Sequence, residues 1–182
     1  MTTQFRKLML TKTHKKLDKE DLFGRVSTFL KGQTMCSLCT CRNEVPRATP
    51  LEYYLDNTSL YIIGHKGIKL QNIKANPRVS IGVYNHVHPR WGEGGNWLGV
   101  IGAQITGTAR LISDDNPQFF KAYKRFASPT VKPATHGEKP RGRIMIVVDM
   151  ESVEYNDIGL KLDGYASKQV WRAPKADKVK EG

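Results

Sequence analysis

The segment that most constrains the fold runs from Thr34 to Tyr84, because short apolar runs alternate there with turn residues. Three runs have the apolar or alternating pattern of strands, and they cover Thr34–Cys41, Val45–Tyr54 and Leu60–Gly64. Dipeptides that contain asparagine separate the three runs, as is typical of tight turns between antiparallel strands. The segment therefore predicts a meander of antiparallel strands.

A short helix and a fourth strand follow the meander. Lys66–Ala75 has a helical pattern, Asn76-Pro77 ends it, and apolar residues then alternate from Val79 to Val83. Lys66 and Lys69 are three residues apart, so we expect them to share a face of the first helical turn. Free N–H groups and the helix dipole also favour an anion there. A phosphate group fits this pattern, and so does a solvated basic turn.

Four pieces of the segment carry a further signal, namely Pro46–Pro50, Leu60–Ile63, Gly67–Lys69 and Asn76–Ser80. In their order and spacing these pieces resemble the FMN-binding split β-barrel superfamily, which contains the pyridoxamine-phosphate oxidases and related flavoproteins. The resemblance extends over residues 20–112. It implies an α+β fold that is mainly β, with a six-stranded antiparallel split barrel and two or three peripheral helices.

The resemblance also implies cofactor-binding residues on the second strand. Arg47, Ala48 and Thr49 match the segment that runs along the ribityl chain and the flavin edge, and Pro50 follows directly. Alternation along a strand places Arg47 and Thr49 on one face and Ala48 and Pro50 on the other.

Two further groups of residues match the family's cofactor site. Ile62 and Ile63 match the strand-three pair beside the isoalloxazine ring, and Lys69 matches the basic residue that holds the FMN phosphate. Many members carry a second basic residue directly before that lysine, whereas this chain has Ile68. We therefore predict that Lys66 takes the place of the second cation.

Length and charge restrict the chain to a few classes. The 182 residues suit a single domain, in which we expect residues 1–16 and 174–182 to be loose tails. The net charge of +12 favours anionic ligands, but no basic run interleaved with aromatic residues indicates a nucleic-acid surface. The sequence has neither a secretory signal nor a membrane span, so we expect a cytoplasmic protein without nucleic-acid or membrane partners.

The remaining segments predict peripheral helices and the rest of the sheet. We expect a helix with Asp18 as its N-cap that ends at Gly32, and a second helix capped by Asp114. Trp97–Ile112 reads as a long strand whose polar face includes Gln104, a candidate cofactor contact. The remaining expected strands, both in the C-terminal third of the chain, are Ile144–Val148, which is apolar on both faces, and Val153–Tyr155. Trp171 has no predicted place.

The cysteines and histidines do not predict a metal site. Cys36 alternates with Cys39 and Cys41, so it should point to the opposite face of its strand, and no fourth cysteine exists. Reduced thiols are the favoured interpretation, with a redox role beside the flavin as the alternative. The glycine-rich segment 85–97, which holds His86, His88, Trp91 and Trp97, is predicted to be a loop or a lid over a planar ligand.

The predicted function is that of an FMN-binding oxidoreductase, with a homodimer that holds FMN at the subunit interface and a small molecule or NAD(P)H as its reactant. A flavin supplies the redox chemistry itself, so a separate catalytic set is not needed and none is predicted. Val153–Trp171 lacks the Arg-x-His element of true pyridoxamine-phosphate oxidases, which argues against oxidation of vitamin B6. The alternatives are a flavin carrier without catalytic activity, a relative that binds a deazaflavin or haem, and a basic barrel that binds nucleic acid and needs no flavin.

Overall fold

The computed structural model describes residue 7 and residues 10–85, 99–126 and 142–174 of the chain. The strands are β1 (Met35–Arg42), β2 (Val45–Asp56), β3 (Ser59–Gly64), β4 (Arg78–Tyr84), β5 (Ile101–Ser113), β6 (Ile144–Asp157) and β7 (Lys168–Arg172). The helices are α2 (Lys19–Lys31), α3 (Ile68–Ala75), α4 (Pro117–Phe126) and the 3-10 helix η2 (Ile158–Asp163). None of the helices in these ranges is long and apolar enough to cross a membrane.

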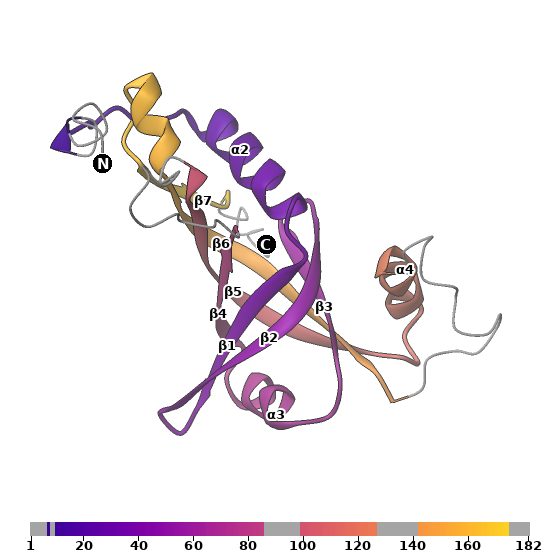
Figure 1. Ribbon diagram of the computed structural model, residues 1–182. Coiled ribbons are helices and arrows are strands. Elements are labelled where there is room, and N and C mark those ends of the chain that lie inside the picture. Colours follow the sequence, from indigo (N-terminus) through magenta and orange to yellow (C-terminus); the bar gives the residue numbers. More distant parts are fainter. Residues whose placement is uncertain (1–6, 8–9, 86–98, 127–141, 175–182) are drawn as a thin grey trace, which may run out of the picture.

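The strands form one antiparallel sheet that closes on itself. Their order is β3-β2-β1-β4-β5-β6-β7, and β3 pairs in addition with β6, so six strands close into a barrel. The predicted six-stranded antiparallel split barrel is therefore confirmed, and β7 adds a seventh strand outside the closed ring. Figure 1 shows α2 at one end of the barrel, α3 at the other end and α4 beside the wall.

The long strand β6 makes this closure possible because it pairs with different strands along its length. Its first half, from Ile144 to Asp149, pairs with β3, and its second half, from Ser152 to Asn156, pairs with β7. On its other edge β6 pairs with β5 throughout, apart from a bulge next to Gly107. The two strands predicted at Ile144–Val148 and Val153–Tyr155 are thus parts of one strand.

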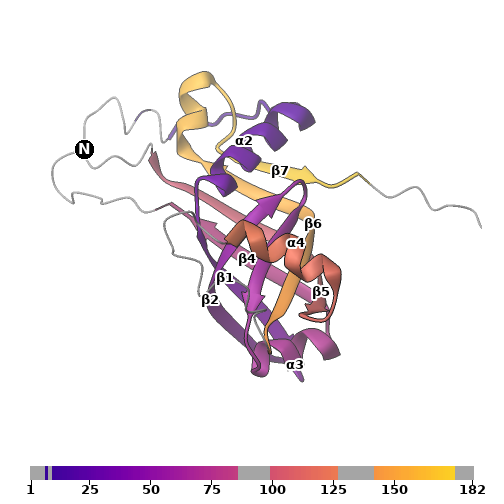
Figure 2. The same cartoon turned by 90° about the vertical axis from the view of Figure 1, so that its right-hand side faces the viewer.

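Apolar side chains form two clusters on opposite sides of the barrel wall. The main cluster fills the barrel interior, and the second lies outside it beneath α4, where Phe119 packs with Met145 and Val147. Met145, Ile146, Val147 and Val148 are all fully buried because α4 covers the outer face of β6. Figure 2 shows α4 lying across this outer face. The prediction that this strand is buried on both faces is confirmed.

Helix α2 has the predicted ends and closes one end of the barrel. The Asp18 carboxylate accepts a hydrogen bond from the backbone N–H of Asp21 at 2.8 Å, and Gly32 caps the C-terminus. The buried face of the helix consists of Leu22, Val26, Phe29 and Leu30. The neighbouring residue Phe23 stacks on Trp171 of β7 at 4.8 Å between ring centroids, which gives this tryptophan its place in the fold.

Two predicted boundaries are wrong. Strand β5 begins at Ile101 rather than at Trp97, which lies outside the described residues together with the rest of segment 86–98. Helix α4 is capped by Asn116, whose side-chain oxygen accepts a hydrogen bond from the Gln118 N–H at 2.9 Å. Asp114, the predicted cap, instead accepts a hydrogen bond from the backbone N–H of Gly142. A contact between residues so far apart in sequence leaves no local sequence signal.

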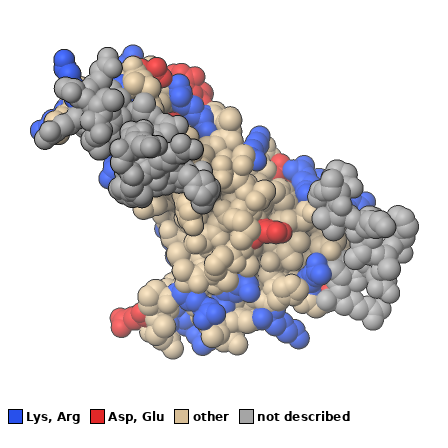
Figure 3. All heavy atoms as spheres, in the orientation of Figure 1, with Lys and Arg blue, Asp and Glu red and all other residues tan. Residues whose placement is uncertain are grey.

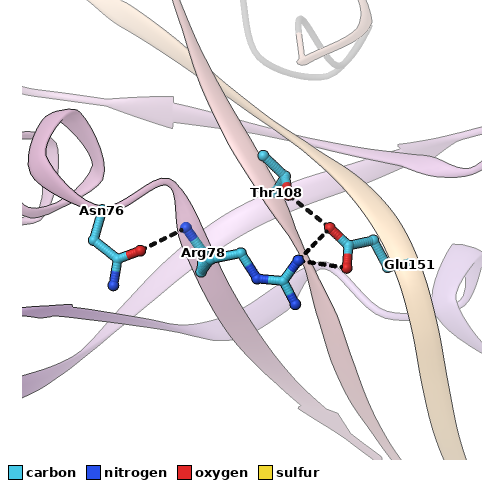
Figure 4. A network of polar contacts seen from close by, with 4 residues as sticks. All are labelled: Asn76, Arg78, Thr108 and Glu151. Carbon is cyan, nitrogen blue, oxygen red and sulfur yellow. Dashed lines mark hydrogen bonds and ion pairs between the residues drawn. The ribbon is translucent and has the colours of Figure 1, made fainter.

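A polar network ties the outer faces of β4, β5 and β6 together (Figure 4). Arg78 donates to both carboxylate oxygens of Glu151 at 2.8 and 2.7 Å, and the Thr108 hydroxyl donates to the same carboxylate at 2.6 Å. The backbone N–H of Arg78 is in turn held by the Asn76 side chain. The bond from Thr108 and the charge of Arg78 lower the pKa of Glu151 below its ordinary value.

Replacing Glu151 by glutamine should lower stability at neutral pH by less than about 1 kcal/mol, because the pair with Arg78 is largely exposed. Because folding lowers the pKa of Glu151, its contribution is present above the pKa of the unfolded chain and is lost as the pH falls through the folded value. Thermal unfolding at pH 7 and at pH 4 should therefore show a difference between wild type and Glu151→Gln that shrinks in acid. A difference that grows in acid would contradict this assignment.

Gly107→Ala should destabilise the barrel by roughly 1–3 kcal/mol, because a β-carbon at this position would clash with the backbone carbonyl of Asp149 on β6. Gly82→Ala is the matched control, since no atom lies within 4 Å of a β-carbon added to that strand. Chemical denaturation should reveal a large loss for the first variant and little change for the second. Equal stabilities would mean that the β5–β6 bulge can relax.

Candidate functional site

The barrel wall is open between β2 and β3 at the end of the barrel that α3 covers. The two strands pair only over Tyr53–Asp56 and Ser59–Ile62, after which β3 continues along β6. Residues 45–52 of β2 therefore pair with β1 on one edge and with no strand of the described ranges on the other. We call the gap bounded by these β2 residues, the end of β3 and the start of α3 the β2–β3 opening.

Strand β2 presents its predicted site residues on two faces, as expected from strand alternation. Thr49 lies opposite Leu38 of β1 and points inward, whereas Ala48 lies opposite Cys39 and is exposed on the outer face. The Thr49 hydroxyl is buried without a hydrogen-bond partner in the described structure. A buried hydroxyl without a partner is costly, so this atom is available to a ligand or a water molecule. Arg47 lies on the same face as Thr49 and Pro50 on the same face as Ala48, and both residues are exposed.

Helix α3 begins later than predicted, which changes the place of one lysine. Its first residue is Ile68, so Lys66 precedes the helix and does not share its first turn. Gly67 is the N-cap, and its φ of 158° is a conformation that residues with a β-carbon rarely adopt. Lys69 lies within the first turn, and its Nζ donates to the carbonyl of His65 at 3.3 Å. The two lysines therefore lie on either side of the helix start, with Lys66 before the N-cap and Lys69 in the first turn.

The cations around the opening have no acidic partners among the described residues. Arg78, Arg110 and Arg125 form ion pairs elsewhere on the barrel, whereas Arg47, Lys66 and Lys69 form none among the described residues. Lys and Arg side chains gather at the end of the barrel where α3 lies (Figure 3). Unpaired cations next to a helix N-terminus create a field that favours an anionic group.

Buried polar contacts fix α3 to the barrel next to Arg47. The Asn72 amide donates to the Thr40 hydroxyl at 3.1 Å, and both side chains are buried. Thr40 lies directly opposite Arg47 in the pairing of β1 with β2. Because Leu70 and Ile73 of α3 are also buried in the barrel core, the helix holds its position rigidly relative to β2.

The two isoleucines predicted beside a flavin ring differ in their surroundings. Ile62 is fully buried in the barrel interior, so its side chain has no surface for a ligand. Ile63 points outward and is half-buried in the cluster beneath α4. Contact of either residue with a cofactor stays a prediction, and only Ile63 offers side-chain surface for it.

Gln104 lies on the outer face of the sheet rather than at the opening. A row of paired residues leads from Gln104 across the sheet to β2. Gln104 pairs with Gly82 of β4, Gly82 pairs with Ser37 of β1, and Ser37 pairs with Pro50 of β2. Three strand spacings therefore separate Gln104 from Pro50, a distance of about 14 Å. The residues between them, Ser37 and Gly82, are small. A role for Gln104 toward a cofactor stays a prediction and requires a ligand that extends across this surface.

The three cysteines divide between the two faces of β1 as predicted. Cys36 is buried in the barrel core, and this burial raises the pKa of its thiol to about 12. Cys39 and Cys41 are half-buried on the outer face. Among the described residues, no three potential ligands come together to hold a metal ion.

One cation near the opening was not identified from the sequence. Arg143 directly precedes β6, and its neighbour Ile144 pairs with Gly64 at the end of β3. Its guanidinium donates to the hydroxyl of Tyr123 on α4 at 3.2 Å. The only sequence signal is a basic residue before an apolar strand, and this pattern does not reveal which residues lie across from it.

A cavity of about 610 Å³ lies at the opposite end of the barrel, beneath α2. Its size is within the range of ligand pockets, and Phe29, Tyr155 and Tyr165 contribute to its lining. Its walls also carry the carboxylates of Glu20 and Asp21 and the guanidinium of Arg25, so acidic groups outnumber basic ones there, which is unfavourable for a phosphate. The β2–β3 opening, with unpaired cations and a free strand edge, is the better site for an anionic ligand.

The residues at the opening fit a phosphate-bearing ligand that also offers hydrogen-bonding groups. Lys66 and Lys69 can hold a phosphate, while the unpaired edge of β2 and the Thr49 hydroxyl can bind donors and acceptors of a planar group. Within the described ranges, neither a serine–histidine pair nor paired carboxylates, the groups of a hydrolytic site, surround the opening.

Comparison with solved structures finds proteins of similar fold. The general stress protein 26 of Bacillus anthracis has a similar fold, with a TM-score of 0.59 and 17% identity, over 84% of this chain and 98% of that one. A FAD-binding protein of Mesorhizobium loti has a TM-score of 0.55 and 22% identity, over 71% and 89%. A haem-binding protein of Mycobacterium smegmatis has a TM-score of 0.56 and 17% identity, over 80% and 55%.

The search of curated proteins found no match to this chain. The family model described as pyridoxamine 5'-phosphate oxidase matches residues 22–157, which extend from α2 to the end of β6 and include the whole β2–β3 opening. This match covers well over half of the chain, so the protein belongs to the pyridoxamine 5'-phosphate oxidase family.

Proposed function

We propose that this protein binds FMN at the β2–β3 opening and acts as a flavin-dependent oxidoreductase. The observation that carries the proposal is the combination of unpaired lysines with a free strand edge in a member of this family. A phosphate attracted by Lys66 and Lys69 places the rest of the nucleotide along β2. A bound flavin would supply the hydride and electron transfer, which the side chains around the opening do not provide.

The residues of the opening have separate roles in this proposal. Lys69 neutralises the phosphate, and Lys66 adds a second cation from the turn before α3. The β2 segment from Arg47 to Pro50 supplies backbone hydrogen bonds, and the Thr49 hydroxyl gains the partner that it otherwise lacks. Ile63 packs at the side of the ring. These contacts position the cofactor, and α3 and β2 exclude water from one side of it.

The substrate is proposed to be a small molecule other than a vitamin B6 phosphate. Residues 153–171 form the end of β6, η2 and β7, and this stretch lacks the Arg-x-His element expected of true pyridoxamine-phosphate oxidases. NAD(P)H is the proposed electron donor. The fold itself is compatible with several cofactors, since the similar structures include a FAD-binding and a haem-binding protein. The lysines suit the phosphate of FMN.

We further propose that the protein is a cytoplasmic homodimer in which two copies pack through the outer faces of β1, β2 and β4. This surface carries small residues such as Ser37, Ser80 and Gly82, and Met35 at its border is half exposed. A flavin at the edge of this surface would lie close to the second copy. A monomeric mass in light scattering would contradict this part of the proposal.

The absorbance spectrum of the purified protein tests the cofactor. We expect the two visible bands of an oxidised flavin, either after purification or after addition of FMN, and we expect NADH or NADPH to bleach them. Bands that no nicotinamide nucleotide bleaches would favour a flavin carrier over an oxidoreductase. A protein that takes up no FMN would contradict the proposed function.

Lys69→Ala should weaken FMN binding by roughly 1.5–3 kcal/mol, which is the scale of a charge-assisted hydrogen bond to phosphate. Lys74→Ala is the matched control, because Lys74 is exposed in the last turn of the same helix, away from its N-terminus. Quenching of flavin fluorescence measures both affinities. If the two variants bind FMN equally well, Lys69 does not hold the phosphate.

A further inference from the structure

The cavity of about 610 Å³ beneath α2 is left open by a glycine that the helix itself does not require. Gly24 lies in the middle of α2 and lines the cavity. Its φ is not positive, and no atom of the described residues lies within 4 Å of a β-carbon added there. A glycine inside a helix lowers stability relative to alanine and is typical of places where the backbone approaches a ligand closely. Neither backbone conformation nor packing explains Gly24, and its effect is to keep the cavity wall free of a side chain.

Aromatic side chains from three parts of the chain line the same cavity. Phe29 comes from α2, Tyr155 from β6, and Tyr165 from the segment between η2 and β7. The Phe29 and Tyr155 rings are buried and meet edge to face, with 5.9 Å between their centroids. A cavity lined by aromatic rings with a few polar groups suits a ligand with a planar apolar body.

The hydroxyl groups of the lining offer acceptors to a ligand. The Thr28 hydroxyl donates to the Gly24 carbonyl at 2.9 Å, and the Tyr155 hydroxyl donates to Asp157 Oδ2 at 3.3 Å. Burial and the nearby charge of Asp157 raise the pKa of Tyr155, so the phenol keeps its hydrogen at neutral pH. A hydroxyl whose hydrogen is engaged still accepts through its oxygen lone pairs. The ligand that fits these groups is therefore a hydrogen-bond donor.

The charges of the lining favour a positive ligand. The carboxylates of Glu20 and Asp21 come from the first turn of α2, and Arg25 is the one cation in the lining. Asp21 and Arg25 are four residues apart, which is the spacing of helical ion pairs, but neither forms an ion pair with a described residue. Lys15 lies outside the lining, with its Nζ 4.4 Å from the Tyr165 ring centroid. Two carboxylates against one guanidinium attract a cation to the Glu20 end of the cavity.

We propose that the cavity beneath α2 binds a small aromatic amine. Its ring packs on Phe29 and Tyr155, and its ammonium group faces Glu20 and Asp21. An ammonium group carries a positive charge and several N–H donors, so it matches both the carboxylates and the acceptors of the lining. The body of the ligand crosses α2 above Gly24, where a side chain would obstruct it. This site does not depend on a flavin, because the β2–β3 opening lies at the other end of the barrel.

Two probes with the same ring and opposite charge test the ligand class. Tryptamine and indole-3-propionate both carry an indole ring, and at neutral pH the first is a cation and the second an anion. Calorimetric titration of the full-length protein should show tryptamine binding at least about tenfold more tightly than indole-3-propionate. FMN should not displace tryptamine. Absence of tryptamine binding, or equal affinities for the two probes, overturns the proposal.

Substitution of Gly24 separates a ligand site from a structural role. Gly24→Ala should raise the melting temperature, because alanine favours the helix, and at the same time weaken tryptamine binding. Gly24→Leu should abolish binding in a folded protein. The matched control is Lys31→Leu, which places a leucine at an exposed position of the last turn of α2, outside the cavity, and should bind tryptamine as wild type does. Unchanged tryptamine affinity in Gly24→Leu contradicts the proposed site.

The charged residues of the lining should affect the two probes in opposite directions. Glu20→Gln should weaken tryptamine binding by about two- to fivefold, and Arg25→Gln should strengthen it by a similar factor because a neighbouring positive charge is removed. Indole-3-propionate should show the reverse order. Structural damage would weaken both probes together, so a parallel loss in both variants overturns the assignment of charge. A protein that binds tryptamine but no FMN refutes the proposed function and leaves this site intact.

Discussion

The pairing of β3 with β6 is the interaction on which the rest of the structure depends. It closes six strands into a barrel, and the same turn of β3 away from β2 leaves residues 45–52 of β2 without a partner on one edge. Unpaired strand edges are normally covered, because their N–H and C=O groups would otherwise attract other strands. Here the closure of the barrel and the creation of a ligand site have the same origin.

The distribution of charge follows from this geometry. On the outer face of the paired strands β4 and β5, Arg78 pairs with Glu151 and Arg110 with Asp149. Around the opening Arg47, Lys66 and Lys69 form no ion pair with a carboxylate of the described residues. A protein that left several positive charges close together without a function would lose stability through their repulsion. An anionic ligand removes this repulsion, which links ligand binding to stability.

The sequence predicted local features well and long-range contacts poorly. The ends of α2 could be predicted because Asp18 and Gly32 act on the helix next to them. The faces of β1 and β2 followed from alternation alone. The start of α3 was misplaced, because the backbone conformation of Gly67 separates Lys66 from the helix. The contact of Arg143 with Tyr123 of α4 was missed, because the two residues are distant in sequence and no local pattern encodes their approach.

Hydrogen–deuterium exchange with and without FMN tests the location of the site most directly, because it does not depend on any substitution. The account predicts slower exchange in the unpaired part of β2 and in the first turn of α3 when FMN is added. The amides of α2, which line the cavity at the opposite end of the barrel, should exchange unchanged. Protection confined to α2 and the neighbouring Ile101, with none in β2, would place the ligand in that cavity and contradict the account.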